Sequence, residues 1–173
     1  MDDSRKDSND PNIGRVLDGR FELTHFLAAG GMGRIYRATQ QPLQRVVAIK
    51  LLNSAGAASE EFRGRFFLEA SLCARLTHPH IVRIFDFGCD RGDTYYIAME
   101  FLEGQALSDR LLEQGPLPTL QALHIIQQAC AGLVDAHQQG MVHRDLKSSN
   151  IMLCSHAGEA DFVKIVDFGI VKD

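Results

Sequence analysis

The sequence predicts an α+β fold, with a five-stranded antiparallel sheet and one helix followed by the first part of a mainly helical region. Three short apolar and β-branched runs between residues 21 and 52, separated by glycine-rich and proline-containing turns, predict three antiparallel strands. Two further runs, at 81–87 and 95–101, complete the sheet. The apolar spacing then changes to a helical period over 119–139, which indicates a second, helical part.

The composition divides the chain into three segments. Residues 1–18 are rich in Asp, Ser, Asn and Arg and carry little apolar surface, which predicts a flexible leader. The change of pattern near Gly104 predicts a boundary between a small lobe at 19–103 and part of a second lobe at 104–173.

Charge and cysteine usage exclude several classes of protein. The 18 Lys and Arg and 22 Asp and Glu residues give a formal net charge of −4, without the basic footprint of a nucleic-acid-binding protein. The four cysteines are far apart and form no CxxC pair, so neither a disulfide framework nor a zinc ribbon is indicated. No apolar run has the length of a membrane span, and the first residues are acidic and polar; we therefore expect a cytoplasmic location.

The first helix is predicted at 59–76. Ser59 is a suitable N-cap, and Glu60 and Glu61 lie in the first turn, where the helix dipole favours acidic residues. Its predicted inner face consists of Phe62, Phe66, Glu69, Cys73 and Leu76.

The second helix is predicted at 119–139, followed by two short strands at 151–153 and 162–166 that form a hairpin. The residues expected on one side of this helix are Leu123, Ile126, Cys130, Leu133 or Val134, and His137.

Three charged residues stand where the pattern predicts burial: Lys50, Glu69 and Asp167. A buried charge needs an opposite charge or a bound ion, so Lys50 and Glu69 could pair while Asp167 binds a cation. Gly30, Gly31 and Gly33 form a turn between two strands, where backbone amides could approach a phosphate closely. A plain tight turn is the alternative for these glycines.

Five motifs in a fixed order carry a family resemblance. The sequence has AxGxxGxI at 28–35, VAIK at 47–50, a helix glutamate in FFLEA, HRDLKSSN at 143–150 and DFG at 167–169. This set resembles the protein kinase family, in particular the bacterial serine/threonine kinases that are similar to eukaryotic ones. The resemblance covers nearly everything after Arg20 and implies a protein-kinase-like fold.

The resemblance implies a role for each charged residue. Lys50 would hold the α and β phosphates of ATP, with Glu69 holding Lys50, and Asp167 and Asn150 would bind Mg²⁺. Asp145 would be the catalytic base for the substrate hydroxyl, with Lys147 near the γ phosphate, as in kinases that act on Ser or Thr. The structural alternatives are an ion pair for Lys50, a turn cap for Asp167, a loop cap for Asn150 and a turn-forming role for Asp145. His143 is expected to be a packed residue that stacks with Phe168.

The resemblance also implies the remaining nucleotide contacts. Adenine would lie between Ala48 and Ile35 on one side and Met152 on the other, with Met99 as gatekeeper. The full set expected to contact nucleotide, apart from Lys50 and Glu69, is Leu27, Ala28, Gly30, Gly31, Gly33, Ile35, Ala48, Glu100, Leu102 and Met152. His78 and His80 could bind a metal, but HPHIV is also an ordinary turn of the family.

The sequence departs from the family pattern in two respects. Ala28 replaces the first glycine of the turn, which should weaken nucleotide binding without abolishing it. The sequence ends four residues after DFG, before the activation loop, the APE motif and the later helices of the family. We therefore expect an exposed apolar patch on the 119–139 helix, which invites association, and negligible transfer to protein substrates.

The function expected is that of an ATP- and magnesium-dependent serine/threonine protein kinase catalytic domain, with a protein hydroxyl as substrate. One alternative is a nonenzymatic module that binds nucleotide or a partner kinase. The other is an unstable gene fragment.

Overall fold

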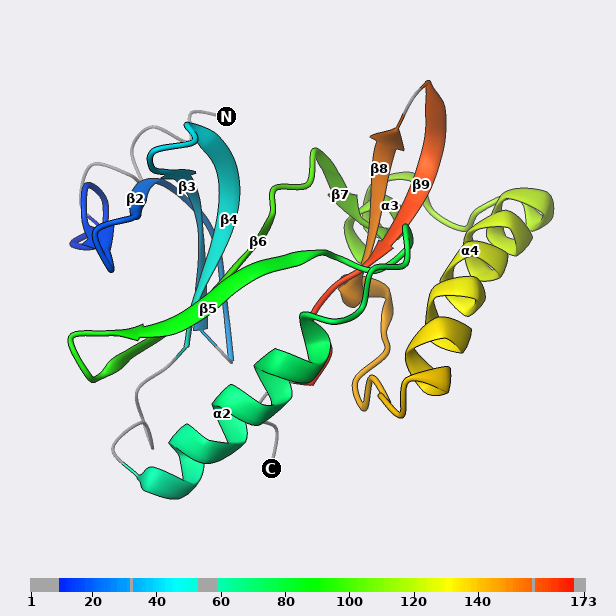
Figure 1. The fold of residues 1–173 in the computed structure, drawn as a ribbon. Helices are drawn as coiled ribbons and strands as arrows, with labels where there is room; N and C mark the ends of the chain where they lie inside the picture. The colour runs from blue at the N-terminus through cyan, green and yellow to red at the C-terminus, as the bar shows by residue number, and fades with distance from the viewer. Residues whose placement is uncertain (1–9, 32, 53–58, 157, 170–173) are drawn as a thin grey trace. The chain divides into compact units, whose positions relative to one another are not determined.

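The computed structural model describes residues 10–31, 33–52, 59–156 and 158–169 (Figure 1). The chain forms two compact units. The first unit contains the residues up to Ala70 together with Ile84–Phe101, and the second contains Ser71–Arg83 together with the residues from Leu102 onward.

The first unit is built on a six-stranded antiparallel sheet in the order β1-β2-β3-β4-β6-β5. The five predicted strands are confirmed, and a short sixth strand precedes them. Their bounds are β1 Val16–Leu17, β2 Phe21–Gly30, β3 Gly33–Gln40, β4 Arg45–Leu52, β5 Ile84–Asp90 and β6 Thr94–Glu100.

The segment before β2 differs from the predicted leader. Residues 1–9 lie outside the described residues, but residues 10–18 pack on the sheet. Leu17 is fully buried in the core, and the backbone of Gly14 and Arg15 exchanges hydrogen bonds with Leu23 of β2. Arg15 also forms an ion pair with Asp90 at 2.7 Å. Because most residues of this segment are polar, the sequence did not indicate that Leu17 belongs to the core. Nor did it indicate the partners of Gly14 and Arg15, which lie outside this segment.

Helix α2 (Glu60–Cys73) packs on the sheet through aromatic side chains. Its N-terminus is capped as predicted, since the backbone N–H of Phe62 donates to Ser59 Oγ at 3.0 Å. The Phe66 ring contacts those of Tyr95 and Phe87, with centroids 5.0 and 6.3 Å apart. The helix ends at Cys73 rather than at the predicted Leu76.

The second unit contains the sheet β7-β8-β9 and two helices (Figure 1). The predicted hairpin is confirmed, with longer strands than expected. The elements are β7 Gly104–Ala106, α3 Leu107–Gln114, α4 Thr119–Gln138, a 3₁₀ turn Ser148–Asn150, β8 Ile151–His156 and β9 Glu159–Ile165. The His78–Val82 segment docks on β9, where Ile165 N donates to His80 O at 2.8 Å and Val82 N donates to Ile165 O at 2.9 Å.

The residues predicted on one side of α4 lie largely at its surface, where the sequence analysis expected an exposed apolar patch. Leu123, Ile126 and Val134 are 57%, 57% and 54% exposed, and Cys130 and His137 are exposed as well. The buried residues are Ile125, Gln128, Ala129, Gly132 and Ala136.

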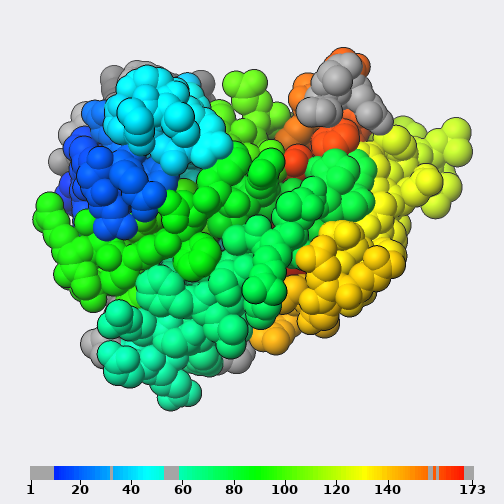
Figure 2. All heavy atoms as spheres, in the orientation of Figure 1, coloured from blue at the N-terminus to red at the C-terminus, as the bar shows by residue number. Residues whose placement is uncertain are grey.

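Close approach and hydrogen bonding explain why this other face of α4 is buried. A Cβ at Gly132 would lie 3.3 Å from His80 O, so the helix packs tightly against that segment. Gln128 donates to Asp161 O at 3.1 Å and accepts from Val163 N at 3.0 Å, which satisfies backbone groups of β9. The expected apolar patch is therefore present on α4, which lies at the surface in Figure 2.

Candidate functional site

The glycine turn joins β2 to β3 in the first unit. Gly30 and Gly33 face each other across it, and Gly33 has a φ of 149°. A Cβ at Gly33 would lie 1.9 Å from Leu51 O, whereas a Cβ at Gly30 or Gly31 would meet no described atom within 4 Å. The turn thus needs glycine at position 33 for its own packing, whereas a side-chain carbon at Gly30 or Gly31 would meet no steric obstacle.

Lys50 lies in the middle of the sheet beside the turn. It pairs with Ile35 of β3 and Ile97 of β6, and its side chain is buried. Glu69 stands one helical turn after Phe66, on the helix that packs against the same sheet. A buried ammonium group requires an anionic partner, and the position of Glu69 on this helix favours the predicted pair. The ion pair between Lys50 and Glu69 stays a prediction.

The expected adenine contacts are distributed over both units. In the first unit, Ala28 pairs with Ile35, and Ala48 pairs with Met99. Leu27 lies on β2, and Glu100 is the last residue of β6. In the second unit, Leu102 precedes β7, and Met152 lies on β8 opposite Ala106 and Lys164.

The second unit brings Asp145, Lys147 and Asn150 together. Asn150 is buried, and its Nδ2 donates to Asp145 O at 2.8 Å and to Asp145 Oδ2 at 3.3 Å. Lys147 Nζ lies 3.1 Å from the same Oδ2. The Asp145 carboxylate is therefore held by a side-chain amide and an ammonium group.

His143 fixes the backbone around this cluster, as expected of a packed residue. Its buried ring lies 4.7 Å from the Phe168 ring, centroid to centroid. Its Nε2 is 2.9 Å from Val166 O, and its Nδ1 accepts from Asp145 N at 3.3 Å. Because a carbonyl oxygen only accepts, the tautomer with the proton on Nε2 satisfies both contacts. His143 thus ties the Asp145 loop to the DFG segment.

Asp167 follows β9 in a left-handed conformation, with a φ of 58°, and Arg144 has a φ of 62°. Left-handed residues other than glycine are uncommon and concentrate at functional sites. Val166 N donates to Asn150 O at 3.0 Å, which joins the backbone next to Asp167 to the Asn150 loop.

The oxygen atoms of this region suit magnesium. Both side-chain hydrogen bonds of Asn150 use its Nδ2, so its Oδ1 is the atom suited to a cation, and Asp167 adds a carboxylate. The described residues contain no cluster of three or more His, Cys, Asp or Glu that could hold a metal. Proteins usually bind Mg²⁺ through one or two carboxylates together with substrate phosphates.

The two histidines of the THPH turn are engaged with backbone. His80 N donates to His78 Nδ1 at 3.1 Å, and His80 Nδ1 lies 2.9 Å from Val163 O. These contacts favour a structural role over the metal site that was the alternative.

Sequence reasoning missed one group beside the glycine turn. Asp10 accepts hydrogen bonds from Arg34 and Tyr36, the first and third residues after Gly33. A buried tyrosine hydroxyl needs a hydrogen-bond partner, so Tyr36 was the one signal in the sequence for a polar group such as Asp10 at this place.

Comparison with known proteins identifies the family. The protein kinase domain model matches residues 21–173, so the chain belongs to the protein kinase family. It is 37% identical to the serine/threonine-protein kinase pkn3 of Myxococcus xanthus over 97% of this chain and 31% of that protein. It is 40% identical to PrkC of Bacillus subtilis over 91% of this chain and 24% of that protein. By homology it is a member of the serine/threonine protein kinases.

Solved structures confirm the predicted fold. The kinase domain of Mycobacterium tuberculosis PknI superposes with a TM-score of 0.80 and 33% identity, over 92% of this chain and 63% of that domain. The chain thus spans less than a third of the two curated relatives and just under two thirds of the solved domain. Among the described helices, none has the length and apolar character required to cross a membrane.

Proposed function

We propose that this chain carries the ATP site and catalytic loop of a serine/threonine protein kinase, which transfers the γ phosphate to a hydroxyl group of a protein substrate. The observation that carries the proposal is the cluster of Asp145, Lys147 and Asn150, joined through His143 to the segment that bears Asp167. Phosphoryl transfer depends mainly on positioning and charge neutralisation, and these residues supply both.

Asp145 is the proposed base. Contacts from Asn150 and Lys147 orient its carboxylate, which would accept the proton of the substrate hydroxyl. Lys147 brings a positive charge to the place where the γ phosphate would lie. Asn150 Oδ1 and the Asp167 carboxylate would hold Mg²⁺, which neutralises phosphate charge when bound.

The first unit would bind the rest of the nucleotide. Lys50 would neutralise the α and β phosphates, and backbone amides of the glycine turn would donate to phosphate oxygens. The methyl group of Ala28 stiffens the turn, so we expect weaker ATP binding than glycine at position 28 would allow.

Calorimetric titration with ATP tests this proposal. We expect magnesium-dependent binding that Lys50→Met weakens about tenfold to a hundredfold, the range for losing one charge-assisted hydrogen bond. Titration in EDTA is the control for the metal. Equal affinity in wild type and Lys50→Met would overturn the site.

A transfer assay separates the enzyme from the nonenzymatic alternative. Asp145→Asn should leave ATP affinity nearly unchanged and abolish any labelling of a serine- or threonine-containing peptide. Labelling by the wild-type chain that Asp145→Asn abolishes would establish the enzyme and overturn the expectation of negligible transfer.

A further inference from the structure

Asp10 is a nearly buried carboxylate outside the residues that match the kinase family. Its side chain is 8% exposed, and the family match begins at residue 21. Tyr36 OH donates to Asp10 Oδ2 at 3.0 Å, and Arg34 Nη1 lies 3.1 Å from the same oxygen. Asn12 N donates to Asp10 Oδ1 at 2.9 Å, which closes a local turn around the carboxylate.

The partners of Asp10 lie on β3 directly after the glycine turn. Arg34 pairs with Ala29, and Tyr36 pairs with Phe26, so both belong to the ladder that closes this turn. The Tyr36 ring is fully buried and packs edge-on against Phe26 at 5.7 Å. Asp10 therefore contacts β3 directly and reaches β2 only through the packing of Tyr36 on Phe26.

Asp10 holds the turn from the side opposite the proposed nucleotide. Side chains alternate along a strand, so Arg34 and Tyr36 share one face of β3, while Ile35 lies on the other. Ile35 is an expected adenine contact. The carboxylate can thus fix the backbone without touching ATP.

The contacts of Asp10 with Arg34 and Tyr36 differ in weight. The Arg34 side chain is 51% exposed, and an exposed ion pair contributes little to stability. The Tyr36 hydroxyl is attached to a fully buried residue, and its hydrogen bond to a charged group is the stronger kind. A second contact, from Asn12 Nδ2 to Tyr36 OH at 3.0 Å, completes the environment of the hydroxyl.

We propose that Asp10, through Tyr36, is a positioning residue that fixes the glycine turn for binding the phosphates of ATP. The inference rests on the proposed nucleotide site. Its physical basis is that backbone amides bind a phosphate well only when their directions are fixed in advance. Loss of the carboxylate should therefore weaken contacts to phosphate and leave contacts to adenine unchanged.

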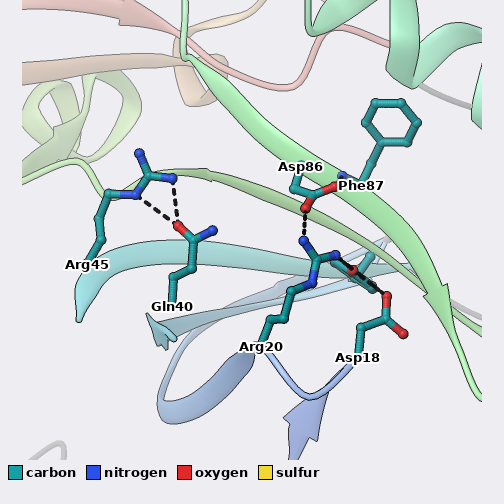
Figure 3. A network of polar contacts seen from close by, with 7 residues as sticks. Asp18, Arg20, Gln40, Arg45, Asp86 and Phe87 are labelled. Carbon is teal, nitrogen blue, oxygen red and sulfur yellow. Dashed lines mark hydrogen bonds and ion pairs between the residues drawn. The ribbon is translucent and has the colours of Figure 1, made fainter. Parts of the chain in front are cut away.

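The experiment compares the affinities of Mg·ATP and of adenosine for four proteins. These are the wild type, Asp10→Ala, Tyr36→Phe and the control Asp18→Ala. Asp18 is a matched control because it also accepts a hydrogen bond from a buried tyrosine, Tyr96, at 2.6 Å, and it lies near Arg20 and Asp86 at the other end of β2 (Figure 3).

We expect Asp10→Ala and Tyr36→Phe each to weaken Mg·ATP binding about fivefold, the effect of one hydrogen bond, with adenosine binding unchanged. Asp18→Ala should bind both ligands as the wild type does. Because Tyr36→Phe keeps the buried ring, it provides the result even if Asp10→Ala fails to fold.

Four outcomes would overturn the inference. An equal loss for ATP and adenosine, or the same loss in Asp18→Ala, would indicate general destabilisation. Unchanged ATP affinity in both variants would remove the positioning role and leave the proposed function intact. A wild-type chain that does not bind Mg·ATP would overturn the proposed function and this inference with it.

Discussion

Replacing Gly33 by alanine should damage the fold itself as well as any nucleotide site. The added Cβ would lie 1.9 Å from Leu51 O and 2.9 Å from Leu51 C, both of them backbone atoms of β4 that cannot rotate away. The φ of 149° adds conformational strain, since this region is almost restricted to glycine and costs about 1–3 kcal/mol for other residues.

The expected loss for Gly33→Ala is about 3 kcal/mol, because relief of the clash must also disturb the pairing of β3 with β4. For a chain of this size, that corresponds to a fall in melting temperature of about 6–12 °C. Thermal unfolding followed by circular dichroism measures it directly.

Gly30→Ala is the matched control. A Cβ at Gly30 meets no described atom within 4 Å, so its melting temperature should stay close to that of the wild type while Mg·ATP binding weakens. Equal melting temperatures for Gly33→Ala and the wild type would refute the reasoning from the close approach to Leu51. Equal destabilisation by both variants would refute the distinction between the two glycines.

Two further predictions concern the second unit. Burial lowers the pKa of His78, and the nearby His80 charge lowers it further. The contribution of His78 to the free energy of unfolding is therefore fully present above the unfolded pKa of about 6.5 and is lost as the pH falls below it. His78→Gln should flatten this dependence of the melting temperature on pH. An unchanged slope would contradict this assignment. Gln128→Ala leaves two backbone groups of β9 without their side-chain partner and should cost about 2–4 kcal/mol in urea unfolding, whereas the exposed Gln127→Ala should cost less than about 0.5 kcal/mol. Similar midpoints for the two variants would contradict the role given to Gln128.

Local patterns predicted the strands, the hairpin and the start of α2. Alternating apolar runs determined the strands because each has one face in the core, and Ser59 marked the helix start because its hydroxyl can cap the backbone. The grouping of Asp145 with Asn150 was also predictable in part, since they are five positions apart in one tight loop.

The errors arose where distant partners decide the structure. The apolar spacing of α4 did not indicate which face is buried, because Gly132 allows close approach and Gln128 satisfies β9 on a face other than the one that carries Ile126. The segment before β2 was predicted to be flexible because Asp10 and Arg15 are polar. Their partners are 26 and 75 residues away, beyond the reach of any local pattern.

A crystal structure of this chain with Mg²⁺ and a nonhydrolysable ATP analogue tests the central claim most directly. We predict Lys50 Nζ within about 3 Å of an α or β phosphate oxygen. We also predict an Asp167 carboxylate oxygen about 2.1 Å from a Mg²⁺ ion on the same triphosphate. Lys50 and Asp167 on opposite faces, with no nucleotide between them, would contradict the proposed site.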